Sequence, residues 1–292
     1  MAARRGWSWT GEPGTGFCGR LQVAARHWFV IGADLGVNPS GAARIARDKV
    51  FAQFFLKQAG LPTIPTRVLH SPADAESIAD FPVLLKPNEG HGGVGVSVAD
   101  HAADLAAAYK LARAASPLVL AQPVIEQREF RVMIFNRQPL LAYEKNPLAL
   151  IGDGSSSIRE LIHTSSLGRR TPTPALTDPR VTTRLRRCGF SPETILSPGQ
   201  RFIPLPTANL QSGGIWRECL AELSPALLNA AGAAAETLGL VMAGVDLFAE
   251  SPAADACVIN EVNASPGLEC LAAESALLDP LFAAIEEYLS RH

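Results

Sequence analysis

Three oxygen-bearing side chains, Asp246, Glu261 and Asn263, interrupt two otherwise apolar runs near the C-terminal end of the chain. Neighbouring carboxylates repel each other and raise a pKa unless a cation neutralises them. Oxygen-only ligands suit Mg²⁺ or Mn²⁺, and Mg²⁺ commonly uses one or two carboxylates together with nucleotide phosphates. The trio therefore predicts a site for Mg²⁺ (or Mn²⁺). Taken alone, it is equally consistent with a solvated hairpin edge that carries ordinary acidic residues.

A β-hairpin would bring this trio together. The apolar runs 241–248 and 257–262 flank a polar tip that contains proline, which is typical of a hairpin. If Glu250 pairs with Cys257, paired positions have a constant sum, and the two carboxylates lie directly opposite each other. The amide lies two residues farther along the strand and points to the same face.

A second candidate site is a glycine-rich turn that follows the apolar strand 81–86. Lys86 ends this strand, and a further strand resumes at 97–99. Glycines allow backbone N–H groups to approach a phosphate closely. The turn matches neither a Walker loop nor a Rossmann loop, and most glycine-rich turns are only tight turns. Lys86 and the upstream Lys49 favour a phosphate ligand. The glycines are Gly90, Gly92, Gly93 and Gly95.

The surrounding pattern alternates helices with short strands. A helix over 42–59 is expected to end at Gly60 as its C′ residue and to bury an apolar stripe of Val50, Phe51, Phe54 and Phe55. Residues 1–40 contain one strand candidate, 28–32. Further strands are expected at 67–70 and 118–121. Further helices are expected over 101–115, 224–238 and 274–290. Two more are expected to begin at Ser71 and at the Ser157/Glu160 capping box. Residues 165–206 are expected to form a long loop with a short helix over the active site.

Another hairpin is predicted from strands 130–135 and 140–145. Pairing Phe135 with Leu140 places Arg131 opposite Glu144. A cross-strand ion pair between them is one interpretation. A substrate carboxylate or a phosphate as the partner of Arg131 is the other, and the pattern favours neither.

Composition limits the class of protein. The chain has 292 residues, enough for one to two domains, and is 47% apolar and 18% charged. The net charge of −2 predicts no attraction to nucleic acid or to an anionic membrane. Five scattered cysteines predict no disulfide framework and a cytoplasmic location. We see neither a signal peptide nor an apolar run long enough to span a bilayer.

Several motifs together resemble the ATP-grasp ligase superfamily, and within it the ATP-grasp module of cyanophycin synthetase. The chain is also similar to glutathione synthetase and to ribosomal-protein glutamate ligase-type enzymes. The resemblance covers about residue 44 to the C-terminus. It rests on Asp-Lys at 48–49, residues 59–62, the strand ending at 86–87, residues 151–154 with 158–162, residues 207–210 with 212–214, Gly-Val-Asp at 244–246 and Glu-Val-Asn-Ala-Ser-Pro-Gly at 261–267.

The resemblance implies an α+β ATP-grasp fold, with two lobes of antiparallel sheet that clasp ATP. The implied division is a lead segment at 1–40, an N-terminal lobe at 41–121 and a C-terminal lobe at 122–292. ATP-grasp ligases usually carry a whole domain ahead of these lobes, and residues 1–40 are too short to form one. We therefore expect a homodimer or a partner protein to replace that domain.

The resemblance also implies roles for individual residues. Asp246, Glu261 and Asn263 would hold the metal. ATP would bind Lys49, Lys86, Lys145, the four glycines and the hinge residues Gln122, Pro123, Val124 and Ile125. Glu129 would accept hydrogen bonds from the ribose, with a surface strand charge as its alternative. The catalytic residues would be Lys86, Lys145, Arg131 and Asn209, the last acting with the backbone of 212–214 on an oxyanion or acyl phosphate.

The implied activity is ATP-dependent carboxylate–amine ligation of amino-acid or peptide substrates through an acyl phosphate. A phosphotransferase and a non-catalytic ATP-binding subunit are the alternatives. D-Alanine–D-alanine ligases place an arginine just before the metal aspartate, where this chain has Gly244 and Val245, so that activity is not expected. The Mur-ligase-like half of cyanophycin synthetase has no counterpart here, so a complete two-step polymerase is not expected either.

Overall fold

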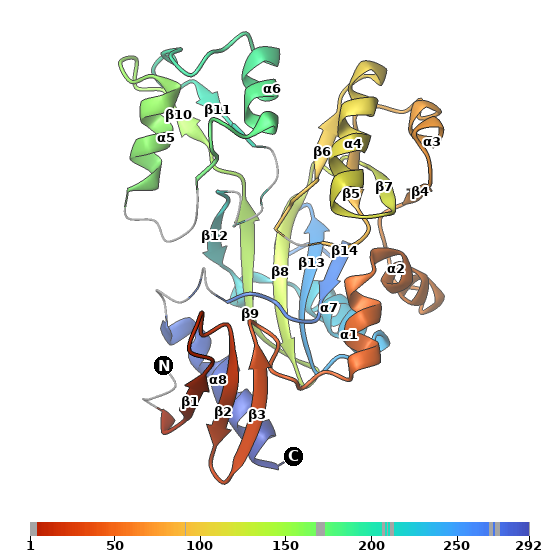
Figure 1. Ribbon diagram of the computed structural model, residues 1–292, viewed down its shortest axis with the longest axis vertical. Helices are drawn as coiled ribbons and strands as arrows, with labels where there is room; N and C mark the ends of the chain where they lie inside the picture. The colour runs from red at the N-terminus through yellow and green to blue at the C-terminus, as the bar shows by residue number, and fades with distance from the viewer. Residues whose placement is uncertain are drawn as a thin grey trace. The chain divides into compact units, whose positions relative to one another are not determined.

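The computed structural model describes residues 5–90, 92–167, 173–205, 208, 210, 213–268, 271 and 275–291. The fold is mixed α+β with antiparallel sheets, as expected for ATP-grasp ligases (Figure 1). It divides into two compact units. The first unit comprises Met1–Ile64, Phe130–Tyr143 and Glu218–His292, and the second comprises Pro65–Glu129 and Glu144–Arg217. Among the described helices, none is both long and apolar enough to cross a membrane.

The first unit begins with an antiparallel meander of β1 (Ser8–Gly11), β2 (Cys18–Val23) and β3 (Arg26–Ile31). The expectation of a single strand here is wrong. Apolar and polar residues alternate poorly along these short strands, and the strands pack against a helix from far along the chain. That helix is α8 (Ser275–Arg291), whose Phe282 ring meets the ring of Trp7 edge-on with centroids 6.0 Å apart.

The helix expected over 42–59 is in fact two helices, α1 (Ser40–Arg47) and α2 (Lys49–Gln58). Asp48 has extended backbone angles, and its side chain accepts a hydrogen bond from the Phe51 N–H at the start of α2. Gly60 follows as C′ with φ +73°, as predicted. The expected apolar stripe is wrong: Phe51 and Phe54 are 57% and 55% exposed. The buried residues of α2 are Ala52, Gln53 and Leu56.

Within the described residues, a five-stranded sheet has the order β12 (Ile215–Glu218), β9 (Gln138–Asn146), β8 (Arg128–Phe135), β13 (Met242–Ala249) and β14 (Val258–Asn263). Residues of its strands join one core cluster with residues of α7 (Pro225–Thr237). Phe130, Val132 and Ile134 alternate along β8 into this core, so the intervening residues face the other side of the sheet. The short 3₁₀ helix η4 (Leu220–Glu222) links β12 to α7.

The β13–β14 hairpin has the predicted pairing at the end that carries the three predicted metal residues. Asp246 is opposite Glu261, and Gly244 is opposite Asn263. The constant register assumed from Glu250 and Cys257 is wrong, because Leu247 is paired with Ile259 and the register shifts after Asp246. Asn260 is the extra residue of this β-bulge.

The second unit contains a four-stranded antiparallel sheet in the order β4 (Arg67–Leu69), β7 (Val119–Pro123), β5 (Val83–Pro87) and β6 (Ser97–Ala99). Helix α4 (Leu105–Ala115), preceded by η2 (Ala102–Asp104), packs on this sheet with α3 (Pro72–Glu76). Ser71 caps α3 in a capping box, as the sequence predicts.

The rest of the second unit has a small core of its own. Helix α5 (Ile158–Ser166) begins at the predicted Ser157/Glu160 capping box. Helix α6 (Pro179–Arg187) is the short helix expected within 165–206, and β10 (Leu150–Ile151) pairs with β11 (Arg201–Phe202). These elements share one hydrophobic cluster, so this region is more ordered than the predicted long loop. The lobe boundaries 1–40, 41–121 and 122–292 stay a prediction.

Candidate active site

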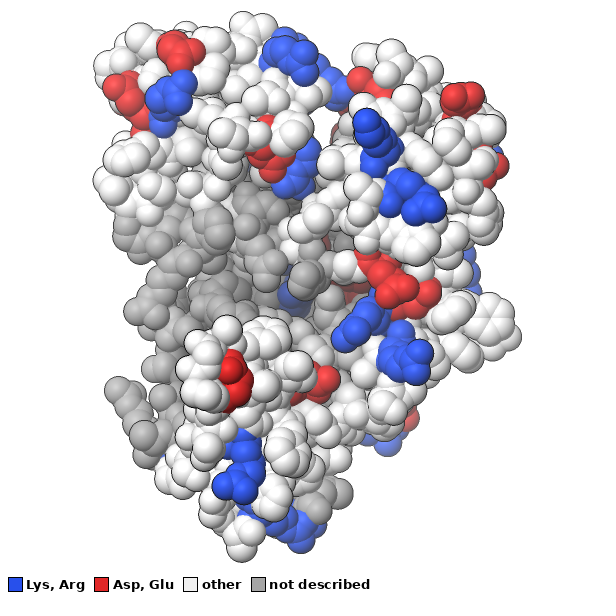
Figure 2. Space-filling view, viewed as in Figure 1, with Lys and Arg blue, Asp and Glu red and all other residues white. Residues whose placement is uncertain are grey.

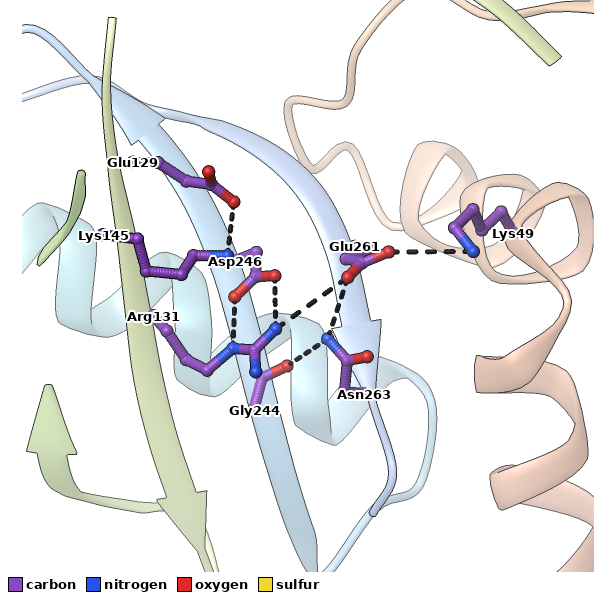
Figure 3. A network of polar contacts seen from close by, with 8 residues as sticks. All are labelled: Lys49, Glu129, Arg131, Lys145, Gly244, Asp246, Glu261 and Asn263. Carbon is purple, nitrogen blue, oxygen red and sulfur yellow. Dashed lines mark hydrogen bonds and ion pairs between the residues drawn. The ribbon is translucent and has the colours of Figure 1, made fainter. Parts of the chain in front are cut away.

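Arg131 and Asp246 form a doubly hydrogen-bonded ion pair on the first unit (Figure 3). Arg131 on β8 donates from Nε to Oδ1 of Asp246 at 2.6 Å and from Nη2 to Oδ2 at 2.7 Å. The Asp246 residue is 1% exposed, so this pair is shielded from water. Parallel N–H···O bonds between arginine and a carboxylate are strong and fix the orientation of both groups.

Glu261 lies beside this pair and has contacts of its own. The Lys49 Nζ is 3.7 Å from its Oε2, and the Arg131 Nη2 is 3.9 Å from its Oε1. The Asn263 amide donates to Oε1 of Glu261 and to the Gly244 carbonyl, each at 3.3 Å. The structure thus brings the three predicted metal residues of the β13–β14 hairpin together with Arg131 from β8 and Lys49 from α2 (Figure 3).

The charges in this cluster balance, because two carboxylates lie among two cations. Burial is the largest single effect and opposes the charge of Arg131, but the attraction and hydrogen bonding of Asp246, together with Tyr143 and Glu261, outweigh it and hold the pKa of Arg131 well above its ordinary value. Sequence reasoning required a cation to neutralise the carboxylates, and the protein supplies Arg131 and Lys49 for this purpose. Glu261, with 27% of its side chain exposed, is the more accessible carboxylate.

The expected cross-strand ion pair of Arg131 with Glu144 is wrong. Glu144 is bound by Arg128, at 2.7 and 2.8 Å, and by Arg217 at 3.3 Å. Positions 128 and 131 differ by an odd number, so their side chains leave β8 on opposite faces. Glu144 shares its face with Arg128, whereas Arg131 turns to β13.

The predicted nucleotide residues of the second unit are largely buried. Lys86, near the end of β5, is 5% exposed, and Lys145 is 7% exposed and forms an ion pair with Glu129. Gln122 donates from its side chain to the Thr66 hydroxyl at 2.7 Å, so its amide group supports the fold. Pro123 ends β7, and Val124 and Ile125, which are predicted to belong to the hinge, follow it.

The glycine-rich segment connects β5 to β6 as predicted. Its four glycines all have positive φ: Gly90 +133°, Gly92 +70°, Gly93 +70° and Gly95 +75°. This backbone conformation is costly for other residues, which explains the glycines without any ligand. The Val96 N–H donates to the Gly93 carbonyl at 3.2 Å and closes a four-residue turn.

Asn209 and Ser212 lie outside the described residues. Gly213 and Gly214, which follow them, precede β12.

Sequence reasoning missed Asn38, which holds the hairpin in place. Its side chain accepts from the N–H groups of Val241 and Met242 and donates to the carbonyls of Met242 and Ala264, at 2.7 to 2.9 Å. The Asn38-Pro39 dipeptide was a turn signal that could have indicated such a role.

Comparisons with known proteins show what the sequence and the fold of this chain are similar to. The family model described as "Carbamoyl-phosphate synthase L chain, ATP binding domain" matches residues 48–130. Cyanophycin synthetase of Geminocystis herdmanii is 32% identical over 253 residues, which cover 79% of this chain and 28% of that protein. The chain thus spans less than a third of the length of this relative.

Solved structures share the fold. A bifunctional glutathione synthetase from Pasteurella multocida has a TM-score of 0.57 at 19% identity, over 92% of this chain and 40% of that one. D-Alanine–D-alanine ligase from Bacillus anthracis has a TM-score of 0.56 at 18% identity, over 87% and 70%. The same ligase complexed with ATP has a TM-score of 0.50 at 17% identity, over 87% and 70%.

The chain belongs to the ATP-grasp superfamily, as the sequence motifs predicted. Within that superfamily, its sequence is similar to the ATP-grasp region of cyanophycin synthetases.

Proposed function

We propose that this chain is an ATP-dependent carboxylate–amine ligase that forms an amide or peptide bond through an acyl phosphate. The observation that carries the proposal is a cluster in an ATP-grasp fold, in which Asp246, Glu261 and Asn263 of the β13–β14 hairpin meet Arg131 of β8 and Lys49 of α2. The names of the relatives support the same reaction class, because cyanophycin synthetase and D-alanine–D-alanine ligase both join a carboxylate to an amine.

ATP is the proposed co-substrate, held by Lys49, Lys86, Lys145 and the glycine turn. Lysine ammonium groups are common ligands of phosphate, so Lys86 and Lys145, which are buried cations, are the proposed contacts of the nucleotide phosphates. Glu129 already pairs with Lys145, so the Glu129 carboxylate would bind both Lys145 and the ribose hydroxyls in this proposal. The Gln122 amide is engaged with Thr66, so we assign adenine recognition to the backbone of 123–125.

The donor set fits Mg²⁺ (or Mn²⁺). Among the described residues, no cluster of three His, Cys, Asp or Glu side chains is positioned to hold a metal ion. A cation would therefore need the Asn263 oxygen and the nucleotide phosphates in addition to the carboxylates. Glu261 and Asn263 would hold it together with Asp246, and a bound metal would neutralise charge on the triphosphate.

The remaining chemistry is charge stabilisation by the chain's own residues. The γ-phosphoryl group is transferred to the substrate carboxylate, with ADP as the leaving group. An amine then attacks the acyl carbon, loses a proton and displaces phosphate. Arg131, Lys86 and Lys145 would stabilise the negative charge that develops on these groups. Asn209, which lies outside the described residues, is retained as the proposed partner of the oxyanion.

The proposed substrates are small amino acids or peptides, and a homodimer or a partner protein would complete the substrate surface. On the face drawn in Figure 2, positive side chains are interspersed with negative ones, which favours such substrates over a nucleic-acid strand. A cytoplasmic location, inferred from the five scattered cysteines, is part of this proposal.

A screen for ADP release tests the function. Purified protein with Mg²⁺ and ATP is offered amino acids and dipeptides singly and in pairs, and products are identified by mass. We expect ADP only when carboxylate donor and amine acceptor are both present, together with a product of amide mass. Glu261→Gln should abolish it, whereas Glu193→Gln, an exposed residue paired with Arg159, should not.

The other outcomes point to the two alternatives. ADP formed with a single co-substrate and a phosphorylated product would identify a phosphotransferase. ATP binding without turnover in every mixture would identify a non-catalytic subunit. The oligomeric state, measured by light scattering, shows whether the chain acts as a homodimer.

A further inference from the structure

Arg180 connects helix α6 to the glycine-rich turn within the second unit. Its Nη1 donates to the Gly93 carbonyl at 2.9 Å. The other two nitrogens of the guanidinium are held by Asp178, with Nε 3.1 Å from Oδ1 and Nη2 2.7 Å from Oδ2. Asp178 also caps α6, because its side chain accepts from the Arg180 N–H. One carboxylate thus aligns both the helix and the arginine, and Nη1 is directed to the turn.

The Gly93 carbonyl accepts two hydrogen bonds, from Arg180 and from the Val96 N–H. A trans peptide unit is planar, so the N–H of Val94 points opposite to the carbonyl of Gly93. Fixing the carbonyl therefore also fixes the direction of the Val94 N–H. Successive backbone N–H groups in a glycine-rich turn form an anion-binding concavity.

A second contact holds α6 beside the same hairpin. Arg187 forms ion pairs with Asp100 and Asp104, which follow β6. Arg180 and Arg187 are seven residues apart, about 10.5 Å along the helix, so they lie on one side of α6. The helix is thus attached both before β6, at Gly93, and after it, at Asp100 and Asp104.

We propose that Arg180 is a positioning residue that sets the Gly93–Val94 peptide so that the Val94 N–H is presented to a phosphate group. Asp178 holds Arg180 in the required orientation. Naming the anion as a nucleotide phosphate rests on the proposed function. The attachment of the turn to α6 does not, and it can be measured in the protein without nucleotide.

Hydrogen exchange and nucleotide affinity test this proposal with Arg180→Ala. Without nucleotide, we expect the Val96 N–H to exchange about tenfold faster, the size expected for loss of a charge-assisted hydrogen bond. The Kd for ATP, measured by titration calorimetry, should rise by a similar factor, and Arg180→Lys should recover part of both effects. Arg186→Ala is the matched control, because Arg186 is exposed on the same helix and its guanidinium donates to Thr183, one turn earlier on α6.

The outcomes separate the two parts of the inference. Equal Val96 exchange in Arg180→Ala and Arg186→Ala would overturn it, provided that the amides of α5 show the same protection in both variants. Faster exchange with an unchanged Kd would overturn the presentation of Val94 to phosphate. If the wild-type protein binds no ATP, the proposed function and the phosphate assignment fail together, while the exchange result still decides whether Arg180 holds the turn.

Discussion

Arg131 and Asp246 lie on neighbouring strands, and each satisfies the other through two hydrogen bonds in a nearly dry environment. The Arg131 guanidinium binds both oxygens of Asp246, the residue that the sequence predicts as a metal ligand. Asp246 therefore has a structural task, which is to orient a buried cation, in addition to its proposed part in metal binding.

We expect Asp246→Asn to lower the free energy of unfolding by about 3 kcal/mol, because removing one partner of a buried ion pair leaves the other charge uncompensated. Chemical denaturation measures this change. Glu236→Gln is the control, since Glu236 forms an exposed pair with Arg137 and should cost less than about 1 kcal/mol. Equal costs for the two variants would contradict the structural role of Asp246.

Glu144 should make stability depend on pH. The hydrogen bond from Arg128 outweighs the opposing effect of burial and holds the pKa of Glu144 below its ordinary value of 4.5. A lowered native-state pKa stabilises the fold above the unfolded-state pKa, and this stability is lost as the pH falls through the native value. The difference in unfolding free energy between the wild type and Glu144→Gln should be constant from about pH 7 to about pH 5 and shrink below pH 4.5. A constant difference down to low pH would refute this assignment.

Asp48→Ala should destabilise the protein by about 1 kcal/mol, because it removes the side-chain cap of α2. Asp48→Asn retains an acceptor and should recover most of the loss. The same urea titration applies to both variants. A loss in Asp48→Asn as large as that in Asp48→Ala would show that the charge, and not the cap, is the source.

Gly95→Ala should destabilise the second unit by at least 1 kcal/mol, because a Cβ there meets three neighbours at 3.2 to 3.3 Å on a backbone with φ +75°. Gly41→Ala provides the contrast. Gly41 is helical with open space around it, so alanine should stabilise the protein by about 0.5 to 1 kcal/mol. Thermal unfolding of the two variants should shift in opposite directions, and a shift in the same direction would contradict the geometry of the turn.

Local patterns were sufficient to predict much of this fold. The capping residues Ser71 and Ser157 begin helices as expected, because a cap depends on only four neighbouring residues. The pairing of Asp246 with Glu261 was predicted as well, although the constant register on which that prediction rested is broken by the bulge at Asn260.

Features that depend on distant contacts were missed. The exposed side of α2 carries Phe51 and Phe54, because β14 and α7 contact α2 and its smaller residues form the buried side. The partner of Arg131 comes from 115 positions along the chain, so a local hairpin register could not identify it. The contact of Arg180 with Gly93 spans 87 positions, and only the folded chain reveals it.

The bulge at Asn260 separates the end of the hairpin that carries Asp246 and Glu261 from the end that carries its tip. Ile259, beside the bulge, donates its N–H to the Pro62 carbonyl, so β14 is anchored independently of the tip. The tip has an anchor of its own, because the carbonyls of Pro252 and Ala254 accept hydrogen bonds from the N–H and the hydroxyl of Ser224, the N-cap of α7. A change of length in the tip is therefore expected to disturb the start of α7 first, while the alignment of the two carboxylates depends on the anchor at Ile259.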